Sequence, residues 1–219
     1  YLDALLRRAS RYSRRVANFL AASKGSEEAS LDAALDELGV DYVDLCLVHS
    51  PIATVAEFIL AYLPHRFGRF DPVRALPRAF AGPVRGALRF LDGLLGADAA
   101  TARLERSRAW KALEAAKRRG VCKAIGVSNY ELPLLKEMDS YASEWPSVNE
   151  LEVHPRYQPG GVLAFCRERG IHVIGYGNGV ALKHDPGGVV AKIAARAGRS
   201  PAQVLLRWAV QQGITVLPR

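Results

Sequence analysis

The segment DYVDLCLVHSP, residues 41–51, constrains the fold of this chain more than any other stretch. Its apolar residues follow one another with little interruption, a pattern typical of a parallel β-strand that is covered on both faces. His49 comes at the end of this run, and Pro51 prevents the strand from continuing because proline has no backbone N–H to donate. A histidine at the carboxyl end of a buried parallel strand lies where α/β barrels carry their chemistry.

Helical and strand segments alternate along the rest of the chain. The segment before residue 41 has Ser26 as a helix cap, leucines on one face and Gly39 as a stop. The sequence predicts strands at residues 16–22, 42–49, 124–128, 148–153, 173–177 and 215–217, with helices between them. These are six of the eight βα units of a (β/α)8 TIM barrel, so the predicted fold class is α/β. The first two units are missing, and we expect the sequence to be incomplete at both ends.

Composition narrows the class of protein. With 219 residues, 49% of them hydrophobic, the chain can form one sizeable core. No apolar run is long enough to span a bilayer and no signal peptide is present, so we expect a cytoplasmic protein. The three cysteines lack the spacing of a disulfide framework or a metal site. The net charge of +8 favours anionic partners, among them a phosphorylated cofactor.

Three strings resemble the aldo-keto reductase superfamily, an NADP-dependent oxidoreductase family. They are LGVDYVDLCLVHSP at residues 38–51, WKALEAAKRRGVCKAIGVSNY at residues 110–130, and SVNELEVHP at residues 147–155. The resemblance covers residues 16–50 and 107–219. It implies a TIM barrel that binds NADPH and reduces an aldehyde or ketone to an alcohol by hydride transfer. It also implies a monomer whose partner is a small-molecule carbonyl substrate rather than a nucleic acid or a membrane, and gives no metal site.

The resemblance also implies a catalytic group. His49 would hydrogen-bond and orient the substrate carbonyl. A tyrosine with an ordinary pKa near ~10 exchanges protons poorly at neutral pH, and a neighbouring ammonium stabilises its charged form. Lys24, at the end of the first predicted strand, is the candidate for that ammonium, and Tyr1 is the candidate tyrosine. The alternatives are that Lys24 is a solvated lysine and that Tyr1 is an arbitrary residue where the sequence begins.

For the cofactor, the resemblance implies that Ser128, Asn129 and Glu150 hold the nicotinamide carboxamide and that Tyr176 stacks on the nicotinamide ring. Glu150 stands where the family has glutamine. Arg219 stands at the start of the family's loop for the adenosine 2′-phosphate. After Tyr176, the residues Gly-Asn-Gly at 177–179 replace the family's Ser-Pro-Leu, so we expect a looser loop there.

Other interpretations remain open. Residues 52–107 form an atypical basic insertion, which is either an anionic docking surface or a solvated decoration of the barrel. A nucleic-acid-binding role lacks interleaved aromatic residues, and GYGNG does not have the GxGxxG order of a dinucleotide-binding fingerprint. The main alternative function is a degenerate barrel relative that binds a nucleotide or a protein partner without turnover, since the family's aspartate is absent. We expect residues 1–219 alone to be inactive.

Overall fold

The computed structural model describes residues 27–49, 99–183, 185 and 187–218. The predicted strand at residues 16–22, the catalytic candidates Lys24 and Tyr1, and Arg219 lie outside the described residues. The chain divides into two compact units, one made of residues 1–51 and 109–219 and the other of residues 52–108. All of the strands described below belong to the first unit.

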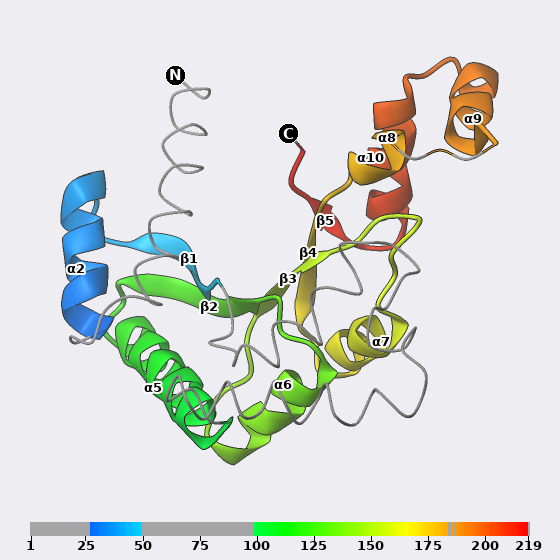
Figure 1. Cartoon of the computed structure of the whole chain (residues 1–219). Helices are drawn as coiled ribbons and strands as arrows, with labels where there is room; N and C mark the ends of the chain where they lie inside the picture. Colours follow the sequence, from blue (N-terminus) through cyan, green and yellow to red (C-terminus); the bar gives the residue numbers. More distant parts are fainter. Residues whose placement is uncertain (1–26, 50–98, 184, 186, 219) are drawn as a thin grey trace, which may run out of the picture. The chain divides into compact units, whose positions relative to one another are not determined.

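The first unit contains a five-stranded sheet in which every neighbouring pair of strands is parallel. The strands are β1 (Val43–Val48), β2 (Cys122–Ser128), β3 (Val148–Glu152), β4 (His172–Tyr176) and β5 (Thr215–Val216). Their order across the sheet is their order along the chain (Figure 1). This arrangement is that of successive βα units, and it confirms the predicted α/β class.

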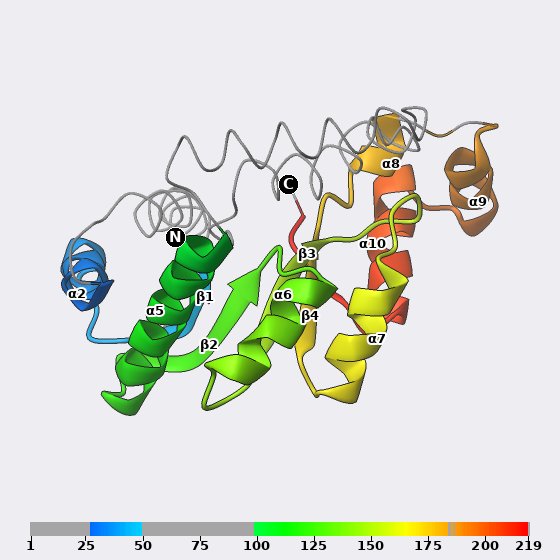
Figure 2. The same ribbon diagram turned by 60° about the horizontal axis from the view of Figure 1, so that its bottom comes forward.

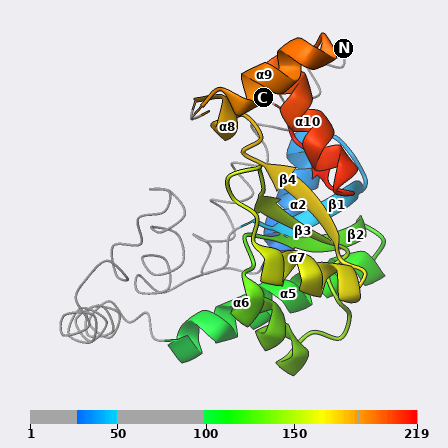
Figure 3. The same ribbon diagram turned by 90° about the vertical axis from the view of Figure 1, so that its right-hand side faces the viewer.

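Helices separate the strands and follow one another beside the sheet in chain order, except that the two short helices directly after β4 lie against the last helix (Figures 2 and 3). They are α2 (Glu27–Leu38), α5 (Ala99–Arg118), α6 (Leu132–Glu137) with the 3₁₀ turn η1 (Met138–Ser140), α7 (Gly160–Glu168), α8 (Val180–Lys183), α9 (Val189–Ala197) and α10 (Pro201–Gln211). Within α5, the residues from Ala109 onward belong to the first unit. In the part of the chain that the structure describes, no helix has the length and apolar character needed to cross a membrane.

The hydrophobic core lies between the strands and these helices. One face of each strand supplies buried side chains, such as Val48, Val127 and Leu151, and the helices supply Trp110 and Cys166. The alternation of side chains along a strand places the remaining strand residues on the opposite face. We call this opposite face the inner face; it carries Leu45, Leu47, Ala124, Gly126, Ser128, Val148, Glu150, Glu152, Ile174 and Tyr176. Most of the inner-face residues on β1, β3 and β4 are only half-buried.

The inner face is narrow at β2, where Gly126 lies between Leu47 on β1 and Val148 on β3. A Cβ atom on Gly126 would come within 2.6 Å of the Val148 carbonyl oxygen and 2.7 Å of Leu47 Cδ2. Both distances are shorter than real Cβ contacts. Gly126 therefore has no room for a methyl group. Its inner-face neighbours on β2, Ala124 and Ser128, are also small.

The helix ends show which sequence signals were sufficient to predict where a helix begins or stops. The residues Ser-Pro-Ala-Gln at 200–203 are a sequence signal for a capping box, and α10 begins with one. The Ser200 hydroxyl accepts from the Gln203 backbone N–H at 3.2 Å, and the Gln203 side chain accepts from the Ser200 N–H at 2.9 Å. Gly39 has a φ of 66°, as a glycine that stops a helix requires. Two features were not predicted. Helix α5 begins at Ala99, whereas the helical pattern of the sequence starts at residue 107. The segment after β4 forms the helices α8 and α9.

Candidate functional site at the carboxyl ends of the strands

Five of the predicted site residues lie together at one edge of the sheet. His49 directly follows β1, Ser128 ends β2 and Asn129 follows it, Glu150 lies in β3, and Tyr176 ends β4. The carboxyl ends of parallel strands meet at the same edge, which is where α/β folds bind ligands. Hydrogen bonds link residues from all four strands at this edge, as the next paragraphs describe.

Asn129 is the centre of this network. Its side-chain Nδ2 donates to the His49 carbonyl oxygen and to Ser128 Oγ, both at 3.2 Å, and its Oδ1 accepts from the Tyr176 hydroxyl at 2.7 Å. Its backbone N–H donates to the Glu150 carbonyl oxygen at 2.8 Å. Asn129 has a φ of 60°, in the left-handed region that asparagine tolerates better than most residues. One side chain therefore ties the ends of β1, β2 and β4 together.

Ser128 and Glu150 are neighbours in the β2–β3 register. The buried Ser128 hydroxyl donates to the Glu150 carbonyl oxygen at 3.1 Å. The Glu150 carboxyl is different, because none of the described residues gives it a hydrogen bond or an ion pair. Burial raises the pKa of Glu150 above its ordinary value, and the positive charge that His49 can carry opposes that rise. The network thus has a partly desolvated acid beside the proposed catalytic histidine.

His154 and Tyr157 make a second set of polar contacts close to this network. The Arg156 backbone N–H donates to His154 Nδ1 at 3.2 Å, so the proton of a neutral His154 is on Nε2, which lies 3.3 Å from Glu152 Oε1. This buried histidine supports a turn. The Tyr157 hydroxyl donates to Glu131 Oε1 at 3.4 Å.

Tyr157 is a phenol close to the candidate site, so its ability to release a proton matters. Burial, and then the negative charge of Glu131, raise the pKa of Tyr157 far above its ordinary value. A phenol in this environment holds its proton at neutral pH. Tyr157 therefore does not fit the role of the acid–base tyrosine that the resemblance assigns to Tyr1.

The loop after β4, where we expect a looser backbone at residues 177–179 than in the family, makes two close contacts in the structure. Asn178 is buried, and its Nδ2 donates to the Val153 carbonyl oxygen at 3.3 Å. Gly177 has a φ of 76° and packs so closely that a Cβ there would lie 3.1 Å from Glu152 Cγ. The sequence signal of two glycines indicated freedom of the backbone, whereas the asparagine between them holds the turn against β3.

The residues present fit the nicotinamide end of the cofactor that the resemblance implies. A carboxamide has an NH₂ donor and a carbonyl acceptor, and it needs both kinds of partner. The Glu150 carboxyl is an acceptor without a described partner. The Ser128 hydroxyl and the Asn129 amide are the donors of the same network, and in this structure both donate to protein oxygens. The Tyr176 ring is fixed from its hydroxyl end by Asn129. Within the described ranges, no group of three or more His, Cys, Asp or Glu residues could hold a metal ion.

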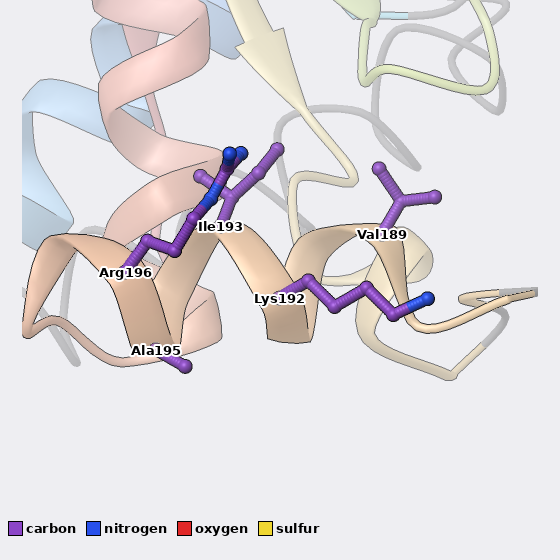
Figure 4. Close-up of a pocket in the computed structure, with 5 residues that line it drawn as sticks. All are labelled: Val189, Lys192, Ile193, Ala195 and Arg196. Carbon is purple, nitrogen blue, oxygen red and sulfur yellow. The ribbon is translucent and has the colours of Figure 1, made fainter.

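Another depression lies on α9, and it does not share this chemistry. It is lined by Val189, Lys192, Ile193, Ala195 and Arg196, all on one short helix (Figure 4). These side chains include no acid and no aromatic ring. We therefore place the candidate site at the strand ends and not on α9.

A comparison with protein families shows to which family a chain with this candidate site belongs. The model of the aldo/keto reductase family matches residues 16–179. The chain belongs to the aldo/keto reductase family. This confirms the resemblance drawn from the three sequence strings. It also explains why polar residues gather at the carboxyl ends of the strands, as they do in barrel enzymes.

Curated aldo/keto reductase relatives are longer than this chain. D-galacturonate reductase of Hypocrea jecorina is 34% identical over 194 residues, which cover 86% of this chain and 53% of that protein. NAD(P)H-dependent D-xylose reductase of Scheffersomyces stipitis is 33% identical over 206 residues, which cover 88% of this chain and 57% of that protein. The chain therefore spans about half the length of the curated relatives it matches.

Solved structures support the same fold. Aldose reductase from Giardia lamblia is similar with a TM-score of 0.57 and 27% identity, and the match covers 87% of this chain and 56% of that structure. The Bombyx mori aldo-keto reductase, solved in complex with NADP, gives a TM-score of 0.59 at 23% identity, covering 87% of this chain and 52% of that structure. The five-stranded sheet is thus part of an aldo/keto reductase barrel of which this chain covers about half.

Proposed function

We propose that the protein containing this chain is an NADPH-dependent oxidoreductase that reduces an aldehyde or ketone to an alcohol. The observation that carries this proposal is the convergence of His49, Asn129, Glu150 and Tyr176 at one edge of the sheet in a member of the aldo/keto reductase family. The relatives that match this chain include reductases of D-galacturonate and of D-xylose, and the second is named as NAD(P)H-dependent.

In this proposal NADPH supplies the hydride, and the residues of the chain hold and orient the reactants. Ser128, Asn129 and Glu150 bind the carboxamide and so fix the rotation of the nicotinamide ring. Tyr176 provides a flat surface for that ring, and its hydroxyl bond to Asn129 fixes the surface in place. A ring held in this way presents one face, which lowers the entropic cost of reaching a reactive geometry.

Proton handling is assigned to three further groups. The His49 imidazole donates a hydrogen bond to the substrate carbonyl oxygen and orients it. Tyr1 is the proposed proton donor to that oxygen, and Lys24 is proposed to lower the pKa of this tyrosine by stabilising the phenolate. Tyr1 and Lys24 lie outside the described residues, so both assignments rest on the sequence resemblance.

The experiment compares NADPH binding and carbonyl reduction in the full-length protein that contains this chain. We expect NADPH binding to be saturable when it is measured by calorimetry. We also expect turnover of a panel of aldehydes and ketones. His49→Gln is expected to lower kcat/KM by about 10²-fold or more while NADPH binding stays within a few-fold, because the imidazole acts on the substrate. His172→Gln is the matched control, because His172 lies at the opposite end of its strand and contacts Thr215 Oγ1 at 2.7 Å. Equal activity of wild type and His49→Gln would contradict the proposal.

A non-catalytic relative is the second candidate. What favours it is Glu150, a partly desolvated acid in the place where the family has a neutral glutamine. In this case a folded full-length protein would bind neither NADPH nor NADH, or would bind one of them without reducing any carbonyl compound in the panel. A circular dichroism spectrum and a cooperative unfolding transition would show that the protein tested is folded.

A further inference from the structure

We propose that Glu150 makes the nucleotide site prefer the oxidised cofactor, NADP⁺, over NADPH. This inference rests on the proposed function, since it requires the nicotinamide to lie at the carboxyl ends of β2, β3 and β4. It goes beyond that function because it assigns to one side chain the difference in affinity between the two oxidation states.

The first step is that, in the part of the chain that the structure describes, no side chain is paired with the Glu150 carboxyl. Its side chain lies on the inner face, beside Ser128 of β2 and Ile174 of β4 in the strand register. The Ser128 hydroxyl is bonded to the backbone carbonyl of Glu150 and not to its carboxyl. The Asn129 amide is bonded to His49, Ser128 and Tyr176. Among the described residues, none donates a hydrogen bond to the Glu150 carboxyl.

The second step concerns the charged groups around Glu150. His49, from the end of β1, is the described group whose charge acts on it, and this charge is present only when the imidazole is protonated. Glu152 shares the inner face of β3 and carries the same sign as Glu150, and its Oε1 lies 3.3 Å from His154 Nε2. Among the described residues, Glu150 and Glu152 are thus the acids on the inner face of β3, and Glu150 is the one that neighbours Ser128 in the strand register.

The third step is the chemistry of the cofactor. The oxidised nicotinamide ring carries one positive charge and the reduced ring carries none. An ionised carboxyl beside the ring therefore attracts NADP⁺ and has no such attraction for NADPH. The attraction is stronger in a half-buried site than in open solvent, because less water screens it. A glutamine has nearly the same shape and no charge, so it would not discriminate in this way.

The size of the effect follows from the proximity of the two charges. A single charge pair in a partly screened site changes an equilibrium constant by a factor on the order of ten. Thermodynamic linkage then sets the consequence for the bound state. A site that favours NADP⁺ shifts the equilibrium between bound reactants toward the oxidised cofactor and the alcohol, and it slows the release of NADP⁺.

The test is calorimetric titration of the full-length protein with NADP⁺ and, separately, with NADPH. Four proteins are compared: wild type, Glu150→Gln, Glu150→Asp and Glu168→Gln. The last variant removes the same charge from an exposed position on α7 and controls for net charge. We expect the ratio of Kd for NADPH to Kd for NADP⁺ to fall about tenfold in Glu150→Gln. The ratio should be unchanged in Glu168→Gln and mostly retained in Glu150→Asp, which keeps the charge.

The outcomes separate this inference from the proposed function. If wild type and Glu150→Gln bind both forms with the same ratio of dissociation constants, the inference is wrong and the proposed function stands. If a folded wild-type protein binds neither form, both are wrong. A fall of the ratio in Glu168→Gln equal to that in Glu150→Gln would assign the preference to net charge and would also overturn the inference.

Discussion

At the scale of single residues, Asn129 determines the geometry of the candidate site. Its amide joins His49, Ser128 and Tyr176, and its backbone adopts a φ of 60°. The sequence identified Asn129 through the string GVSN, but it assigned the residue only to the cofactor. Its bond to Tyr176 joins residues 47 positions apart, and no local pattern predicts such a contact.

We therefore expect Asn129→Ala to destabilise the protein by about 2–3 kcal/mol. About 1 kcal/mol comes from placing alanine at a positive φ, and the rest from the lost hydrogen bonds. Asn129→Gly is the matched variant, because it loses the same bonds and relieves the backbone strain, so it should cost less. Urea denaturation measures both free energies of unfolding. Equal losses in the two variants would show that the positive φ carries no strain.

Glu150 is expected to make stability depend on pH. Burial raises the pKa of Glu150 in the folded state above its ordinary value of 4.5. The folded protein then holds more protons than the unfolded protein between these two pKa values, so this residue's contribution to stability falls as the pH rises through that range. Glu150→Gln removes the dependence. The variant should match wild type below about pH 4 and exceed it in stability at neutral pH.

Thermal unfolding of wild type and Glu150→Gln across this pH range measures the difference. Glu168→Gln again serves as the control, because its carboxyl is exposed on α7. A constant difference between wild type and Glu150→Gln at all pH values would mean that the substitution acts through packing and not through ionisation.

At the scale of elements, the strands followed closely from the sequence and some helices did not. The apolar runs of β1 to β4 are short and end at polar residues or glycine, and that of β5 ends before Pro218, so periodicity and stop residues were sufficient to predict these strands. Helix α9 begins after Gly188, which has a φ of 62°, and no Ser, Thr, Asp or Asn precedes it directly. Its cap comes from Asp185, whose carboxyl oxygens accept from the N–H groups of Val190 and Ala191 at 3.2 and 3.1 Å. A cap placed this far upstream falls outside the usual sequence signal.

Helix α10 offers a test of a cap that the sequence did predict. Ser200→Ala removes the hydroxyl that accepts from the Gln203 N–H, and we expect a loss of about 1 kcal/mol. Ser200→Thr keeps a hydroxyl and should retain most of the stability. Denaturant unfolding of the two variants measures the difference. If Ser200→Ala and Ser200→Thr are equally stable, the capping box contributes nothing measurable.

Strand β2 offers a test of close packing. Gly126→Ala places a methyl group 2.6 Å from a backbone carbonyl of β3, so the strands must move apart. We expect a destabilisation of about 1–3 kcal/mol, typical of overpacking. Gly160→Ala is the control, because a Cβ at the start of α7 meets no atom within 4 Å. Thermal unfolding should separate the two substitutions, and a Gly126→Ala variant as stable as the control would contradict the packing argument.

At the scale of the whole molecule, this chain supplies part of a barrel. The described sheet has β1 and β5 as its outer strands, and the inner-face residues Leu45, Leu47 and Ile174 are only half-buried. The sequence predicted the class of fold because each βα unit carries its own signals. The positions of Lys24 and Tyr1 relative to His49 stay a prediction, because those two residues lie outside the described part of the chain.

Residues 1–219 expressed alone are therefore expected to show no carbonyl reduction and to bind an apolar fluorescent dye more strongly than the full-length protein does. A closed barrel covers its inner face, whereas a partial one leaves half-buried apolar side chains to be solvated. Loss of NADPH absorbance measures the first expectation and dye fluorescence the second. Measurable turnover by residues 1–219 would show that the missing barrel units are dispensable.

The small side chains of β2 have a consequence for reshaping the candidate site by mutagenesis. On the inner face, β2 presents the small residues Ala124, Gly126 and Ser128 toward its carboxyl end, while β3 and β4 present the larger Glu152 and Tyr176 across the same edge. Gly126 cannot accept a larger residue without separating the strands, and Ser128 is committed to a hydrogen bond. Changes of side-chain size on the inner face are thus confined to β3 and β4. A mutant library aimed at altered substrate size should leave β2 unchanged.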